Sequence, residues 1–228
     1  MNELAQKLIE ELQCETVFTI PVLGGIPVSE AVVVTWIIMA VLVIAAFILT
    51  RNLKVDHISK RQAVAESIVI GLMNMVQGMV GEKGRKYVPY LTTVMLYIGV
   101  SNIIGLFGFK SPTKDLRVTV ALALMSIILI EAAGIYHKGV KRWLHGFVEP
   151  VAIVTPINIL EVVTKPLSLC MRLFGNVLGA FVIMELLKMI LPVGLPVVFS
   201  LYFDIFDGLL QAYVFVFLTS LYIDEITE

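Results

Sequence analysis

The chain contains 228 residues, of which 58% are hydrophobic and 15% are charged. Soluble domains average roughly 45–50% apolar and about 25% charged residues, and the mean hydropathy of +0.93 likewise argues against a water-soluble globule. Seventeen Lys and Arg residues balance eighteen Asp and Glu residues to a formal net charge of −1. The chain therefore lacks the basic field with which proteins gather nucleic acid, and no nucleic-acid partner is expected.

The first predicted membrane element follows a polar segment, residues 1–27, whose early charges resemble neither a secretory nor a mitochondrial leader. Residues 31–50 then contain no charge over twenty positions. At about 1.5 Å per residue, such a helix matches the roughly 30 Å hydrocarbon core of a bilayer. The sequence predicts a first transmembrane helix over residues 28–50.

The rest of the chain is a series of apolar stretches with short polar interruptions. Residues 62–82 are apolar on one side but include Glu66, Asn74 and Gln77, which predicts an amphipathic helix near the membrane surface. A helical hairpin is predicted over residues 87–136 and a second hairpin over residues 151–223. Together these elements predict an all-α polytopic membrane protein, one membrane domain over residues 1–228 with about five membrane-crossing helices and one interfacial helix.

The last hairpin is too long for two upright spans. If residues 155–191 are mainly helical, they extend about 55 Å, nearly twice the hydrocarbon thickness. Pro156 and Pro166 are places where the helix could bend, and residues 191–194 supply the turn into the final helix. We expect the last two helices to be long and strongly tilted.

The distribution of basic residues predicts the orientation. Residues 51–86 hold seven of the seventeen Lys and Arg residues, and residues 137–144 add three more, whereas the N-terminal segment has only Lys7. The positive-inside rule places these basic loops in the cytoplasm and the N-terminus outside. Five crossings return the C-terminus to the cytoplasm.

Ionisable and amide side chains lie inside the predicted tilted hairpin. An intramembrane charge costs at least about 2.5–3.5 kcal/mol, so such residues are functional candidates. The alternative is internal pairing, which the spacing allows for Glu161 with Lys165 and for Glu185 with Lys188. The full set is Asn158, Glu161, Lys165, Arg172, Asn176, Glu185, Lys188, Asp204, Asp207 and Gln211.

Arg172 differs from the other charged residues because no acid stands three or four positions away. Its neighbours on the same helix face are Ser168 and Asn176, which are neutral. A guanidinium stays protonated in proteins, so it cannot lower its cost by losing a proton. We therefore expect Arg172 to face a carboxylate supplied from elsewhere.

The order of the polar residues along the hairpin separates them into two clusters. Asn158, Glu161 and Lys165 fall toward the cytoplasm, whereas Glu185 and the two aspartates fall toward the outside. The spacing predicts Asp204, Asp207 and Gln211 on one helix face, with Gln211 near the level of Arg172. This pattern indicates two offset half-pathways for a cation, separated by a fixed positive charge. Glu131, in an earlier span, could extend a pathway or hydrogen-bond another helix.

Metal, disulfide and enzyme motifs are missing from the sequence. Cys14 and Cys170 lie far apart without the spacing of a zinc site or a disulfide framework. Residues 81–86 have the wrong spacing for a phosphate-binding loop, and no metalloprotease or nucleophile-elbow pattern occurs. We expect no cofactor and no catalytic activity of the chain alone.

Three segments resemble subunit a of the membrane (Fo) sector of bacterial F-type ATP synthases: Lys165–Asn176, Leu210–Tyr222 and Pro156–Glu161. By this resemblance, Arg172 is the essential stator arginine, Asn176 and Gln211 are its polar companions, and Ser168 belongs to the rotor-facing surface. The family's two ionisable outer-channel positions match Phe181, which cannot exchange a proton, and Asp204. We infer that Asp204, helped by Asp207 and Glu185, forms the outer relay.

The resemblance implies a stator subunit with two half-channels that pass protons or sodium ions to and from carboxylates of the c-subunit ring. It also implies a b-subunit peripheral stalk and other ATP synthase subunits as partners, in a bacterial plasma membrane. The main alternative is a stand-alone secondary cation transporter or channel. Against it, the hairpin has no obvious inverted repeat, and the Arg172 charge would oppose simple conduction.

Overall fold

The structure, a computed structural model, describes residues 16–20, 26–51, 53, 59–82, 84–107, 111–148, 152–190 and 199–227. Almost all of these residues are helical. The main helices are α2 (Glu30–Thr50), α3 (Lys60–Val80), α4 (Val88–Ile103), α5 (Leu116–Lys138), α6 (Val140–Gly146), α7 (Thr155–Ile190) and α9 (Gly208–Thr227). A π-helix, η5 (Leu201–Asp207), leads directly into α9. The all-α polytopic membrane fold expected from the sequence is confirmed, with six helices in the described part that are long and apolar enough to cross a membrane.

One element was not expected from the sequence: a small antiparallel hairpin of β1 (Thr16–Ile20) and β2 (Ile26–Ser29). It begins within the predicted N-terminal segment and extends to Ser29, so the first helix starts at Glu30 and not at residue 28 as predicted. Ser29, at its end, donates a hydrogen bond to the buried carboxylate of Asp115 at 3.0 Å. The hairpin is thereby tied to the start of α5.

Local signals explain where several helices begin and end. The Ser59 hydroxyl caps α3 by accepting a hydrogen bond from the Gln62 backbone N–H, and the Asp115 carboxylate caps α5 in the same way at Arg117. The two helices end at Gly81 and Gly139, whose φ angles are 70° and 77°. Glycine adopts this backbone conformation without steric cost, so the chain can turn sharply there.

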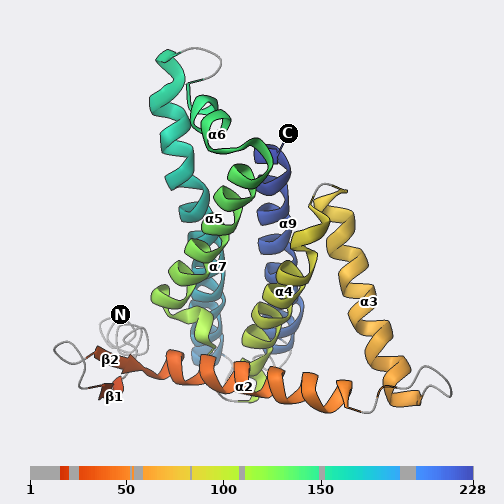
Figure 1. The fold of residues 1–228 in the computed structure, drawn as a ribbon. Helices are drawn as coiled ribbons and strands as arrows, with labels where there is room; N and C mark the ends of the chain where they lie inside the picture. Colours follow the sequence, from red (N-terminus) through yellow and green to blue (C-terminus); the bar gives the residue numbers. More distant parts are fainter. Residues whose placement is uncertain are drawn as a thin grey trace.

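Helix α2 crosses the other long helices at a steep angle (Figure 1). Only one of the two directions can therefore lie along the membrane normal. Helix α2, which has no charged residue after Glu30, has 21 residues, a length that matches the bilayer, whereas the 36 residues of α7 extend about 54 Å. By its length, α7 must tilt strongly or extend beyond the hydrocarbon core, and it continues as a helix through Pro166.

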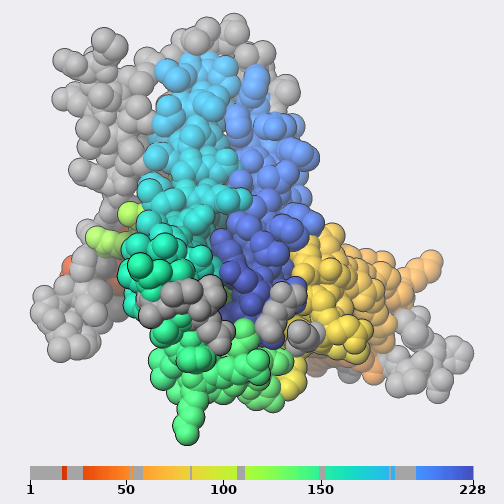
Figure 2. Space-filling view, turned by 90° about the horizontal axis from the view of Figure 1, so that it is seen from above, coloured from red at the N-terminus to blue at the C-terminus, as the bar shows by residue number. Residues whose placement is uncertain are grey.

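The core lies where α4, α5, α7 and α9 pack against one another. Its fully buried side chains include Ile98 of α4, Ile130 of α5, Leu173 of α7 and Ile223 of α9. Figure 2 shows α7 and α9 side by side, with α3 on the other flank of α9. By contrast, the buried residues of α2 are only Ala31, Val34 and Ile38, as expected for a helix that faces lipid.

Glycine at position 208 allows α9 to approach α4 closely. A Cβ atom built there would lie 2.7 Å from the Asn102 Cβ, whereas one at Gly99, in the same interface, would lie 3.5 Å from its nearest neighbour. We expect Gly208→Ala to destabilise the protein by about 1–3 kcal/mol through overpacking. Gly99→Ala is the matched control, expected to be neutral or stabilising. Thermal unfolding of the purified protein in detergent checks this, and equal unfolding temperatures for the two variants would contradict it.

Candidate functional site

Helix α7 places Arg172 on its outward face. Leu169, Cys170 and Leu173 are almost fully buried against the bundle, and the hydroxyl of Thr119 in α5 contacts the Cys170 thiol at 3.5 Å. Because a helix turns about 100° per residue, this packing leaves Arg172 somewhat more than a quarter turn away from the buried side of α7. Arg172 and Ser168 are both exposed.

One hydrogen bond fixes the register of the two helices of the hairpin. The side-chain amide of Asn176 in α7 donates to the carboxylate of Asp207, directly before α9. Arg172 lies one turn before Asn176, and Gln211 lies one turn after Asp207. In antiparallel helices these steps run in the same direction, so Gln211 is level with Arg172, as the sequence predicts.

The Arg172 guanidinium forms no hydrogen bond or ion pair within the described ranges of the chain. Exposed apolar side chains lie nearby in sequence on α7 and also occur along α9: Leu167 and Met171 of α7 are 56% and 55% exposed, and Leu210 and Phe217 of α9 are each 41% exposed. A permanent cation on such a surface favours a carboxylate brought by another chain. That this carboxylate exists stays a prediction.

Asp204 and Asp207, the aspartates predicted to lie toward the outside and here called the outer cluster, contact two different neighbouring segments. The Asp204 carboxylate accepts a hydrogen bond from Ser200 at 2.9 Å. It lies against the 3₁₀-helix η2 (Ile104–Phe107), which directly follows α4, because a Cβ atom built at Gly105 would be 3.2 Å from it. Asp207 instead contacts α7 through Asn176. The spacing of a regular helix predicts both carboxylates on one face; the intervening π-helix changes their relative direction.

Phe181, at the position matching an ionisable family residue, contacts a cation. The Lys114 ammonium lies 4.5 Å from the centre of its ring, close enough for a cation–π interaction. The positive charge here comes from the turn between α4 and α5. The side chains of Glu185 and Lys188 and the predicted turn at residues 191–194 lie outside the described residues.

Sequence reasoning missed a buried polar network that holds the start of α9. Asn102 donates to the backbone oxygen of Gly208 at 2.9 Å, and Thr113 donates to the Asn102 side chain at 2.8 Å. The Ser111 hydroxyl contacts Thr113 and donates to the backbone oxygen of Ser101. The available signal was the Ser101-Asn102 pair inside an apolar stretch. This network positions the adjacent Asp207.

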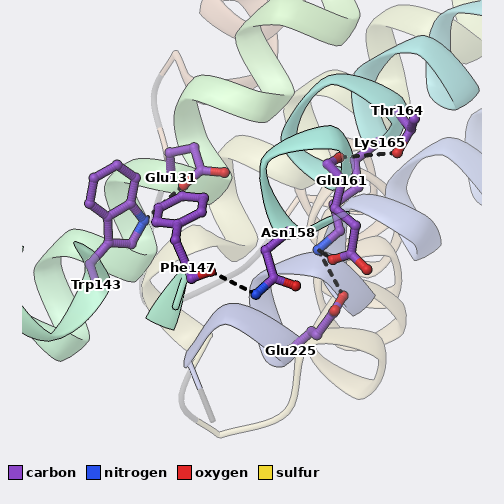
Figure 3. A network of polar contacts seen from close by, with 8 residues as sticks. All are labelled: Glu131, Trp143, Phe147, Asn158, Glu161, Thr164, Lys165 and Glu225. Atoms are coloured by element: carbon purple, nitrogen blue, oxygen red, sulfur yellow. Dashed lines mark hydrogen bonds and ion pairs between the residues drawn. The ribbon is translucent and has the colours of Figure 1, made fainter. Parts of the chain in front are cut away.

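Asn158, Glu161 and Lys165, the residues predicted to lie toward the cytoplasm, are here called the inner cluster. They line a cavity of about 390 Å³ between α5, α6, α7 and the end of α9. Figure 3 shows Lys165 between two acids: its ammonium is 3.1 Å from a Glu225 carboxylate oxygen and 3.7 Å from a Glu161 oxygen. Asn158 donates to the backbone oxygen of Phe147 at 2.9 Å. The local pairing of Glu161 with Lys165 is therefore present, and sequence reasoning missed the shorter contact from Glu225.

Glu131 also belongs to this cavity. The Trp143 indole N–H of α6 donates to its carboxylate at 2.9 Å. This contact confirms the expected possibility of a hydrogen bond to another helix. Because Glu131 also lines the cavity, it contributes a carboxylate to the inner cluster as well.

Comparison with known proteins decides the family. The model of the "ATP synthase A chain" family matches residues 32–224. The chain belongs to the ATP synthase A chain family. It is 36% identical to ATP synthase subunit a of Moorella thermoacetica, covering 88% of this chain and 92% of that protein. It is 31% identical to ATP synthase subunit a 2 of Acaryochloris marina, with coverages of 88% and 86%.

A third relative is named for its ion. The chain is 34% identical to the "ATP synthase subunit a, sodium ion specific" of Propionigenium modestum, over 87% of this chain and 74% of that protein. Membership in this family makes the chain a multi-pass membrane component of a bacterial ATP synthase that works with the other subunits of the complex. The chain is an ion-channel subunit of the stator, and a stand-alone transporter is not favoured.

Proposed function

We propose that the tilted hairpin of α7 and α9 passes cations to and from a ring of c subunits through two offset half-channels. The observation that carries this proposal is Arg172: one exposed guanidinium without a partner in the described part of the chain, on a hairpin whose exposed side chains are largely apolar. A ring of apolar helices with one membrane carboxylate each would complement this face. We assign the transported ion as a proton or sodium ion, with no bound cofactor and no catalysis by the chain alone.

The outer half-channel ends at the carboxylates of Asp204 and Asp207, with Asn176 bound to the latter. We assign Asp204 as the main relay residue, with Asp207 and Glu185 as helpers. The inner half-channel begins at the cavity lined by Glu131, Glu161 and Glu225. Arg172 and Gln211 lie between the two polar clusters along the hairpin, and Ser168 lies one turn toward the inner side.

The charge of Arg172 explains how the two half-channels stay separate. A rotor carboxylate must be neutral while it faces lipid, because an ionised group there is costly. A cation arriving from the outer side neutralises one carboxylate, and a second carboxylate that approaches Arg172 is stabilised in its ionised form and releases its cation to the inner side. The guanidinium also repels cations that would pass directly. A membrane potential contributes about 2.3 kcal/mol per charge per 100 mV to this movement.

The remaining assignments concern the membrane and the partners. We propose a bacterial plasma membrane, with the N-terminus outside and the C-terminus in the cytoplasm, because the basic loops at residues 51–86 and 137–150 favour the cytoplasm. The lipid-exposed α2 is a surface on which a b-subunit peripheral stalk could pack.

Reconstitution tests the proposal. The purified chain alone in lipid vesicles should pass neither protons nor sodium ions, whereas vesicles that also contain the c ring and the stalk should pass one of them. Ion flux through the chain alone would contradict the proposal. The response of ATP hydrolysis by the assembled complex to added sodium then identifies the ion.

A further inference from the structure

A small cavity of about 320 Å³ lies where α2 ends and α3 begins, and it is lined by Phe47, Ile48, Arg51 and Arg61. Figure 1 shows the end of α2 beside the start of α3, away from the α7 and α9 hairpin. The cavity sits where the uncharged span of α2 gives way to basic residues, which is the boundary between hydrocarbon and headgroups. It is separate from both polar clusters of the ion pathway.

Among the described residues, the two arginines bring positive charge to this cavity without an acidic partner. Both side chains are exposed, and neither forms a hydrogen bond or ion pair with any residue that the structure describes. The described acids of the two helices are Glu30, at the opposite end of α2, and Glu66, which accepts a hydrogen bond from Gln62 at 2.7 Å. The charges therefore favour an anionic ligand, and paired guanidinium groups match the oxygens of a phosphate.

The other wall of the cavity is apolar and exposed. Phe47 is 67% exposed and Ile48 is 52% exposed, on the helix that crosses the bilayer. A soluble anion gains nothing from such a wall, whereas a lipid gains contact for its acyl chains beside its headgroup. Basic pockets at the ends of transmembrane helices bind anionic headgroups in this way.

We propose that this cavity binds an anionic phospholipid, with its phosphate between Arg51 and Arg61 and its acyl chains along Phe47 and Ile48. The bound lipid would bridge α2 and the helix α3, which packs on α4 and α9. The site thereby links the membrane anchor of the chain to the bundle that carries the ion pathway. It concerns anchoring and does not depend on the ion that the hairpin transports.

Lipid titration of the purified full-length chain tests this proposal. Native mass spectrometry in detergent counts bound phosphatidylglycerol and bound phosphatidylcholine. We expect the wild-type chain to retain phosphatidylglycerol preferentially, and R51Q/R61Q to lose about tenfold or more of that affinity, since each arginine contributes about 1 kcal/mol. The control R85Q/K141Q removes two exposed charges that do not line this cavity, and it should bind like the wild type.

A further variant and a competition experiment distinguish lipid binding from the alternatives. Phe47→Ala keeps both guanidinium groups and should also weaken phosphatidylglycerol binding, so the proposal stays testable if R51Q/R61Q unfolds. Equal binding of the two lipids, or unchanged phosphatidylglycerol binding in R51Q/R61Q, would overturn the proposal. Displacement of the lipid by millimolar inorganic phosphate would also overturn it, because the site would then be one for a soluble anion.

Discussion

Arg172→Ala should abolish ion-driven ATP synthesis in membranes while leaving ATP hydrolysis by the soluble sector intact. Removing the guanidinium removes the charge that stabilises an ionised rotor carboxylate, and an uncompensated intramembrane charge costs about 3 kcal/mol, which corresponds to roughly a hundredfold in the equilibrium. Synthesis in inverted membrane vesicles and hydrolysis by the detached sector are the two measurements. Preserved synthesis would refute the assigned role.

Two further variants test position and charge. Arg85→Ala, at an exposed arginine outside the hairpin, is the control and should leave synthesis unchanged. Because Gln211 is level with Arg172, the exchange R172Q/Q211R keeps a guanidinium at the same height on the neighbouring helix. We expect it to recover part of the synthesis that R172Q loses. Equal activities of R172Q and R172Q/Q211R would show that the height of the charge is not what matters.

Asp204→Asn should reduce ion transport by about tenfold or more, because the amide cannot take up and release a proton. Phe181→Ala, at the other position that matches an ionisable family residue, should change transport much less, since the phenyl ring exchanges no proton. The measurement is ATP-driven ion uptake by membrane vesicles that contain equal amounts of the complex. Asp204→Glu keeps the ionisable group and should retain more activity than Asp204→Asn. Equal effects of Asp204→Asn and Phe181→Ala would remove Asp204 from the relay.

The helices could be predicted because they depend on local composition and length. Residues 31–50, which carry no charge, are long enough for one membrane-spanning helix. The apolar stretch after residue 151 is too long for two helices that cross the bilayer upright. The level of Gln211 opposite Arg172 also followed from the sequence, because the hairpin is antiparallel and its turn is marked by prolines. These features need no knowledge of how distant segments pack.

Two contacts that sequence reasoning missed join segments far apart in the chain. The i, i+4 rule finds Glu161 for Lys165, but Glu225, with the shorter contact, is sixty positions away. The Asn102 contact with Gly208 joins segments more than a hundred residues apart. Periodicity along one helix carries no information on which face of another helix it meets, so these partners required the structure.

The π-helix η5 affects how side-chain directions in this chain can be inferred from residue spacing and from alignment with relatives. A π-helix accommodates one more residue than the regular helix it interrupts. The regular helical period therefore places Asp207 correctly relative to Gln211. It predicts the wrong direction for the Asp204 side chain. A relative with one residue fewer in this segment would turn a different side chain toward the 3₁₀-helix that follows α4, and only an alignment with a gap at this point would pair the two chains correctly on both sides.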